Sequence, residues 1–273
     1  MFPFVDGFHW SFGHILFLSV FGGVLALIGI TLMVSLRRSA RAALSGQSEA
    51  IRWKSDFHDL AANELSCRHE LAGRVEHRHC HNEFDCRKCE THPKLANAAA
   101  TSEFDVSTYG LSYPSDRLYH RGQTWVKRED DGTLTVGLTD LGQRLMGRPD
   151  SVELPAAGEL LHANGQGWTM MRNGARVRLL SPVDGEVLEA GGPDQDFYLR
   201  IKPAGAQANL THLLRGAEVS GWVRSQLERL QILTTPEGAK PSLADGGVLM
   251  EDLPKAQPDA DWDKVYGEMF LEP

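Results

Sequence analysis

Apolar and polar positions first separate an N-terminal segment from the rest of the chain. Residues 15–36 (ILFLSVFGGVLALIGITLMVSL) contain no charged side chain. A helix rises about 1.5 Å per residue, so this run is long enough to span the roughly 30 Å hydrocarbon core of a bilayer. Arg37, Arg38 and Arg41 follow it directly, whereas residues 1–14 hold no Lys or Arg. The positive-inside rule therefore predicts a single-pass anchor in an inner or plasma membrane, with the C-terminal domain in the cytoplasm. A cleaved signal peptide is disfavoured because its basic residues precede the apolar run.

The next segments are more polar. Residues 37–66 are rich in Ala, Leu, Arg and Glu and predict a helical stalk after the anchor of residues 1–36. A partial apolar stripe supports the helix and comprises Ile51, Trp53, Phe57 and Leu60. Residues 67–116 combine a Cys/His segment, residues 67–92, with an Ala-, Ser- and Thr-rich linker, residues 93–116.

Residues 117–235 have the pattern of a compact, mainly β domain. Short β-branched runs recur, among them QTWVKRE, TLTVGL, WTMM, ARVRLL and GEVLEA, and turn signals such as Asp131-Gly132 and Asn173-Gly174 separate them. Helices are predicted at Thr139–Met146, with Thr139 or Asp140 as N-cap, and at Glu218–Leu233. Many short strands with few helices predict a small barrel or sandwich.

The distribution of charge argues against nucleic-acid binding and indicates the character of the C-terminal residues. The net charge of −8 argues against nucleic-acid binding, which needs a basic face. Residues 236–273 hold nine acidic and three basic side chains and predict a solvated or partner-seeking acidic tail. An apolar cluster near its end either packs back on the β domain or serves as a docking peptide. Its members are Trp262, Val265, Tyr266, Met269, Phe270 and Leu271.

All four cysteines lie in the Cys/His segment, with the spacing Cys67-x12-Cys80-x5-Cys86-x2-Cys89. Clustering of this kind favours a metal site over disulfides in a reducing compartment. Four thiolates can close a tetrahedral zinc site, which is the leading expectation, or hold an iron–sulfur cluster. A third alternative is reduced cysteines without a ligand, and the nearby histidines are alternative ligands or solvated residues. These are His69, His77, His79, His81 and His92.

Other reactive arrangements are not indicated. Cys86-x-x-Cys89 is followed by Glu90 rather than His, which argues against a c-type haem. Neither a Ser/His/Asp nor a Cys/His arrangement is credible from spacing, so the chain is predicted not to be an enzyme.

A series of short motifs runs through the β domain in order: Tyr119-His120, Thr124-Trp125-Val126, Asp131-Gly132-Thr133, Val136-Gly137-Leu138-Thr139-Asp140, Leu145-Met146-Gly147, Val152-Glu153-Leu154-Pro155 and Ser181-Pro182-Val183-Asp184-Gly185-Glu186-Val187. Together they resemble the H protein of the glycine cleavage system. The resemblance implies a barrel-sandwich hybrid of the lipoyl/biotinyl type. It also implies a lipoylated lysine at a hairpin tip, seven residues before the Ser-Pro-Val run.

That position is Gly174 here, and no lysine lies within Met170–Arg176. Asn173-Gly174 is instead a favoured pair for a type I′ hairpin turn. No lipoate is therefore expected, and Lys127 and Lys202, the nearest lysines, fall in predicted strands. The leading hypothesis is a membrane-anchored, non-lipoylated docking or scaffold subunit with a structural metal site and an unidentified protein partner. The alternatives are an iron–sulfur redox subunit of a membrane complex, or a carrier lipoylated at Lys127 or Lys202.

Overall fold

The computed structural model describes residues 9, 11–44, 65–82, 84–96, 106–108, 110–205, 208–235 and 249–270. The chain divides into two compact units, Met1–Arg52 and Trp53–Pro273. Each is described by itself.

The described residues of the first unit form one helix, α1 (Phe12–Leu44), preceded by residues 9 and 11. Its segment Phe12–Val34 is long and apolar enough to cross a membrane, as the sequence predicts. The helix continues past Leu36 into the first residues of the expected stalk, so no break separates the two there. Gly46 and the stripe from Ile51 to Leu60 lie outside the described residues.

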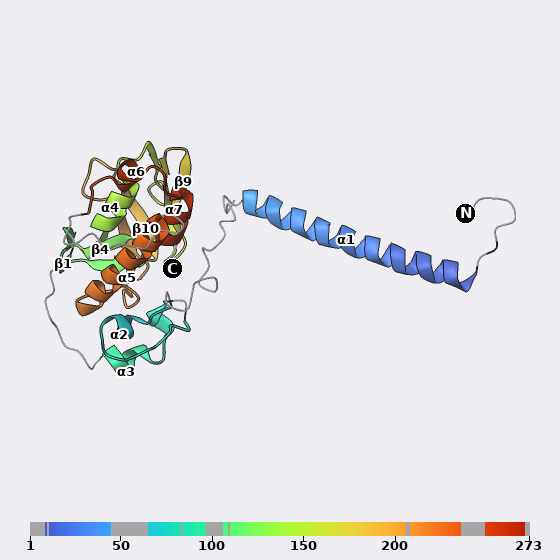
Figure 1. The fold of residues 1–273 in the computed structure, drawn as a ribbon, viewed down its shortest axis with the longest axis horizontal. Helices are drawn as coiled ribbons and strands as arrows, with labels where there is room; N and C mark the ends of the chain where they lie inside the picture. Colours follow the sequence, from blue (N-terminus) through green and yellow to red (C-terminus); the bar gives the residue numbers. More distant parts are fainter. Residues whose placement is uncertain are drawn as a thin grey trace. The chain divides into compact units, whose positions relative to one another are not determined.

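The second unit is built on two antiparallel sheets and a hairpin (Figure 1). The larger sheet has the strand order β3-β4-β5-β11-β10-β7, and the smaller has the order β6-β8-β9. The strands of the larger sheet are β3 (Leu118–His120), β4 (Thr124–Arg128), β5 (Leu134–Leu138), β7 (Leu160–Leu161), β10 (Gly185–Ala190) and β11 (Leu199–Pro203). Those of the smaller sheet are β6 (Ser151–Glu153), β8 (Gln166–Arg172) and β9 (Ala175–Leu180). The expected mainly β architecture is confirmed.

Alternating side chains of both sheets fill one apolar core. On β8 and β9 the inward positions Trp168, Met170, Val177 and Leu179 are at most 1% exposed. Between β4 and β5 the packing is close enough to require glycine: a Cβ on Gly137 would lie 2.4 Å from the indole ring of Trp125. Burial of this apolar surface is the main stabilising contribution to the domain.

Both predicted helices of the domain are present. The first is α4 (Asp140–Met146), whose N-cap Thr139 accepts a hydrogen bond from the Gly142 backbone N–H, and Gly147 ends it with a positive φ of 59°. The second is α5 (Ala217–Thr234). The predicted apolar face of α5 is buried, and it consists of Val219, Trp222, Val223, Leu227 and Leu230.

The expected linker of residues 93–116 contains more structure than its composition indicates. It contributes most of α3 (His92–Ala96) and a hairpin of β1 (Val106–Thr108) and β2 (Leu111–Tyr113). Leu111 and Tyr113 are each 1% exposed. The linker prediction is wrong for these residues because two apolar side chains in a polar stretch suffice to bury a short strand.

The C-terminus is likewise folded over residues 249–270, and the prediction of a solvated acidic tail is wrong there. It forms α6 (Leu253–Ala256) and α7 (Trp262–Phe270), and α7 packs against β9 and α5. The α7 side chains of Val265, Tyr266, Met269 and Phe270 are at most 1% exposed. Packing of this cluster on the β domain, one of the two alternatives, is confirmed, whereas Leu271 lies outside the described residues.

Candidate functional site

Two places could carry chemistry, and the first is the β8–β9 hairpin. Arg172 pairs with Ala175, so Asn173 and Gly174 alone form the loop. Their φ angles are 49° and 80°. Two successive positive φ angles in a two-residue loop are those of a type I′ turn, as predicted from the Asn-Gly pair.

The apex of this hairpin holds no amine. A Cβ on Gly174 would have no heavy atom within 4 Å, so the position faces open space. The neighbouring Asn173 backbone N–H donates to Asp150 at 2.7 Å, and Arg176 pairs with Glu153 at 2.9 Å. The apex can present backbone, amide and ion-paired groups, but nothing that forms a lipoyl amide.

The two nearest lysines lie in strands of the other sheet, as predicted. Lys127 is on β4 and Lys202 on β11. The ammonium of Lys127 pairs with Asp116 at 3.0 Å, and hydrogen bonding to that carboxylate raises the pKa of Lys127. Neither lysine stands at a turn that projects it toward a partner.

The second place is the Cys/His segment, where backbone hydrogen bonds hold the cysteines in two pairs. The Cys67 N–H donates to Arg78 O at 2.8 Å, and the Cys80 N–H donates to Leu65 O at 2.6 Å. Together with the bridge between Ser66 and His79, these bonds form a short antiparallel ladder. Because side chains alternate along a ladder, Cys67 and Cys80 project from the same face.

Cys86 and Cys89 form the other pair, on a tight turn. The short helix η2 (Cys86–Lys88) begins after Asp85, whose carboxylate accepts hydrogen bonds from the Arg87 backbone and side chain at 3.0 and 2.8 Å. Although burial opposes it, hydrogen bonding to Arg87 lowers the pKa of Asp85. The capped turn places both thiols at the ends of one loop.

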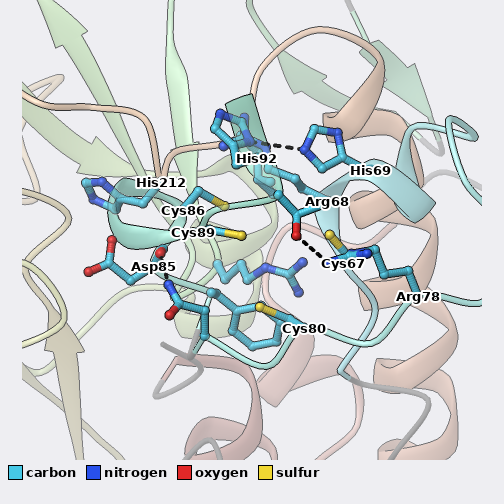
Figure 2. Close-up of a pocket in the computed structure, with 15 residues that line it drawn as sticks. Cys67, Arg68, His69, Arg78, Cys80, Asp85, Cys86, Cys89, His92 and His212 are labelled. Atoms are coloured by element: carbon cyan, nitrogen blue, oxygen red, sulfur yellow. Dashed lines mark hydrogen bonds between the residues drawn. The ribbon is translucent and has the colours of Figure 1, made fainter. Parts of the chain in front are cut away.

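All four cysteines line one small pocket (Figure 2). Its cavity is about 20 Å³, and each cysteine is a partly buried free thiol. Burial raises the pKa of Cys86, and the nearby Arg68 offsets only part of this effect. Among the residues that the structure describes, no three Cys, His, Asp or Glu side chains stand close enough together to hold a metal ion. The structure thus brings the four expected ligands to one cavity without placing them at ligand distances.

Two histidines of the pocket, His69 and His92, contact each other, whereas the Nδ1 atom of a third, His212, is buried without a hydrogen-bond partner among the described residues. His69 Nε2 lies 3.1 Å from His92 Nδ1, and Arg74 lies 3.0 Å from His69 Nδ1. Burial, with further contributions from His92 and Arg74, lowers the pKa of His69 to about 4. At neutral pH this residue is therefore an uncharged, hydrogen-bonded part of the fold, and His77, His79 and His81 are exposed.

A buried ion pair joins the Cys/His segment to the β domain. Arg68, on α2 (Arg68–Leu71), pairs with Glu218 of α5, and their side chains are only 4% and 3% exposed. Arg68 also donates to the Leu213 carbonyl at 2.8 Å, and Arg74 pairs with the same glutamate at 3.1 Å. The two helices approach so closely that a Cβ on Gly221 would lie 2.0 Å from the Leu71 carbonyl oxygen.

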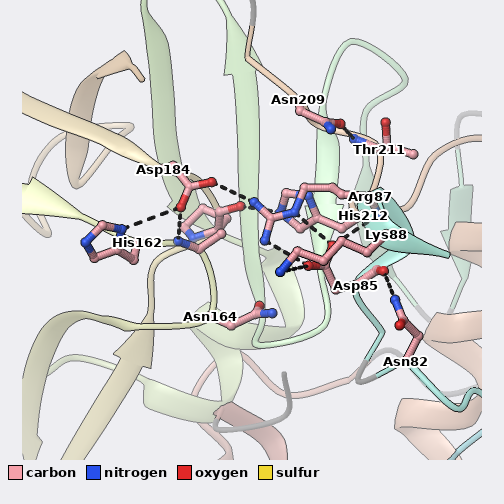
Figure 3. Close-up of polar contacts among 12 residues, drawn as sticks. Asn82, Asp85, Arg87, Lys88, His162, Asn164, Asp184, Asn209, Thr211 and His212 are labelled. Carbon is pink, nitrogen blue, oxygen red and sulfur yellow. Dashed lines mark hydrogen bonds and ion pairs between the residues drawn. The ribbon is translucent and has the colours of Figure 1, made fainter. Parts of the chain in front are cut away.

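A second ion pair connects the cysteine turn to the Ser-Pro-Val-Asp-Gly run. Figure 3 shows Arg87 between Asp85 and Asp184, and it lies 2.6 Å from Asp184. Asp184 also accepts the Ala163 N–H at 3.0 Å. Burial raises the pKa of Asp184, but this hydrogen bond and Arg87 outweigh it and lower the value overall.

Arg121 forms a third contact between the β domain and the Cys/His segment. Its guanidinium stacks 3.8 Å above the Phe84 ring and donates to Ser66 O at 2.9 Å. Sequence reasoning missed Arg68, Glu218, Asp184 and Arg121, because their partners are remote in sequence and no local pattern marks an arginine that will be buried.

The β domain is similar to known proteins. The family model "Glycine cleavage H-protein" matches residues 117–192. The glycine cleavage system H protein of Nitrosospira multiformis is 35% identical over 119 residues, which are 39% of this chain and 92% of that protein. The glycine cleavage system H protein 2 of Pseudomonas syringae is 31% identical over 120 residues, 40% of this chain and 94% of that protein. A crystal structure of the H protein from Mycobacterium marinum aligns with 41% of this chain and 99% of its own, at 20% identity and a TM-score of 0.35.

Proposed function

The chain belongs to the glycine cleavage system H protein family, and we propose that it acts within that family as a membrane-anchored docking subunit that carries no lipoyl group. The main support for this proposal is the residue at the tip of the β8–β9 hairpin. Where the resemblance implies a lysine, the chain has Gly174 in a two-residue turn with Asn173. The turn keeps the hairpin and offers no nucleophilic amine to a lipoylating enzyme.

The surroundings of the hairpin support this proposal. Arg172, the last residue of β8, pairs with Asp252 at 2.8 Å, just before α6, and α7 packs on β9. The C-terminal segment, residues 249–270, therefore stabilises the hairpin as a fixed surface. A fixed surface suits recognition by a partner, whereas a carrier needs a reactive arm.

Intact-mass measurement on the full chain from its native cell tests the missing lipoyl group. We expect this chain to have the mass of the unmodified sequence. A lipoylated H protein detected in the same cells is the positive control, because it shows that lipoylation was active. A mass increase equal to one lipoyl group would overturn the proposal, and peptide mapping would show whether Lys127 or Lys202 carries it.

A Gly174→Lys variant measures access to the apex. Its new side chain would point into open space. The positive φ makes the substitution cost about 1 kcal/mol. We expect lipoate ligase to modify this variant and to leave the parent chain unmodified. Modification of both chains to the same extent would show that another residue accepts the group.

The anchor is the second part of the proposal, and it is supported by α1 and the arginines that follow its apolar segment. We expect the chain to resist alkaline extraction from membranes. Protease should remove residues 65–270 from inverted vesicles but not from right-side-out vesicles. Release of a shortened chain into the soluble fraction would instead identify a cleaved leader.

A further inference from the structure

We propose that Cys67, Cys80, Cys86 and Cys89 together bind a single zinc ion, which fastens the Cys/His segment to the β domain. This zinc site would be independent of the hairpin and of the absence of lipoate. It would give a function to a segment that lies outside the residues 117–192 matched by the family model.

The first support is the convergence of two separately held cysteine pairs. Cys67 and Cys80 project from one face of a backbone ladder, and Cys86 and Cys89 end a capped turn. All four reach the same cavity although 22 positions separate the first from the last in sequence. The two pairs approach the cavity from separate elements, and zinc–sulfur bonds of about 2.3 Å would draw all four thiolates to one ion.

The cavity has room for one ion. Its volume is about 20 Å³. A cavity of roughly 10–15 Å³ holds one water-sized particle, so this one accommodates a single ion. Four soft thiolates in a tetrahedral arrangement are the ligand set of structural zinc sites.

Two other candidate ligands in the pocket already have partners. Both ring nitrogens of His69 have partners, and the Asp85 carboxylate accepts from Arg87. His212 also lines the pocket, and its buried Nδ1 has no hydrogen-bond partner among the described residues. The thiols are the one group of four donors of the same kind in the pocket, which is the number a tetrahedral zinc site needs.

Positive groups also surround the site. Four thiolates and one zinc ion carry a net charge of −2, and three arginines, Arg68, Arg78 and Arg121, line the cavity together with Asp85. Positive groups next to such a site stabilise the thiolates and orient them.

The segment also needs a stabilising link. Among the described residues of 67–92, Phe84 is the one apolar side chain in the buried core, alongside the buried polar residues Arg68 and His69. So few buried apolar groups offset only part of the entropy of ordering the segment, and ion pairs such as Arg68 with Glu218 contribute to holding it in the metal-free chain. A structural metal adds further free energy, as it does in other small modules.

Metal analysis of the detergent-solubilised full chain, purified without added metal or chelator, is the first test. We expect about one zinc per chain. The matched variants are Cys80→Ser and His81→Ala, because the residues are adjacent and only the first is a proposed ligand. Zinc should be lost from Cys80→Ser and from Cys86→Ser, and retained by His81→Ala.

Cobalt titration of the metal-free parent chain keeps the test valid if a cysteine variant fails to fold. We expect thiolate-to-cobalt charge transfer and the visible bands of tetrahedral cobalt, saturating at one equivalent and abolished by zinc. Iron in place of zinc, with or without sulfide, overturns the assignment and favours the redox subunit. A chain that contains no metal and develops no tetrahedral cobalt spectrum also overturns it.

Discussion

The β domain and the Cys/His segment are stabilised by different interactions. The domain buries a continuous apolar core that includes Trp168, Val177 and Phe270. The segment is attached through charges: Arg68 with Glu218, Arg87 with Asp184, and Arg121 above Phe84. Apolar burial tolerates many side chains of suitable volume, whereas a buried charge depends on one partner. The chemistry follows the same division, since the family-like hairpin has no reactive group and the segment holds all four thiols.

The largest effect is expected from Glu218→Gln. It leaves Arg68 buried without its carboxylate, at a cost of about 3–5 kcal/mol to the docking of the segment. Alkylation of the four thiols in the metal-free chain should therefore accelerate about a hundredfold or more. Glu153→Gln, which breaks an ion pair whose side chains are each 62% exposed, is the matched control and should change nothing. Equal rates for the two variants would show that the segment is held by something other than this pair.

Gly221→Ala tests the close approach of α2 and α5. The added methyl group would overlap the Leu71 carbonyl, and we expect a loss of about 3 kcal/mol, measured by hydrogen exchange in residues 67–92. Gly267→Ala is the control in α7, because a Cβ there meets no atom within 4 Å. It should stabilise the chain by about 0.5–1 kcal/mol through helix propensity. If both variants behave alike, α2 does not rest on α5.

His120 is a buried titratable group in the otherwise apolar β domain, and it should make the stability of the domain depend on pH. Its imidazole bonds Asn164 at 2.8 Å, and burial, with His212 nearby, lowers its pKa to about 3. The unfolded chain takes up the proton near pH 6.5 and the folded chain does not, so stability is present above that value and declines below it. From pH 7 to pH 5 we expect a loss of about 2 kcal/mol from this residue. Chemical denaturation of the parent and of His120→Gln at both pH values measures it, and equal pH dependence would contradict the assignment.

The smallest effect is expected from Arg87→Gln. Asp184 is 41% exposed, so the pair contributes about 1 kcal/mol or less and should weaken further in high salt. The measurement is the rate of Cys89 alkylation in the metal-free chain at low and high ionic strength. Arg176→Gln, in an exposed pair, is the control. A large effect of Arg87→Gln that does not depend on salt would contradict this expectation and show that the Arg87–Asp184 pair behaves as a buried ion pair.

Local sequence accounts for much of the fold. The Asn173-Gly174 turn, the Thr139 cap and the buried stripe of α5 each depend on neighbours within a few positions, and the structure confirms all three. The hairpin at Val106–Tyr113 could not be predicted, because its apolar residues are too few to show a period. The apolar cluster of α7 was visible in the sequence, but its packing on β9 and α5 was only one of two alternatives, because that choice depends on distant surfaces.

The sequence by itself determined the apolar N-terminal helix, the β architecture and the absence of a lysine at the hairpin apex, since these depend on local pattern and residue identity. Only the tertiary structure decided that four cysteines share one cavity and that Arg68 and Glu218 meet across 150 positions. Electrostatic and thiol contacts act through space over a few ångströms, and chain separation carries no information about which groups the fold will bring within that range.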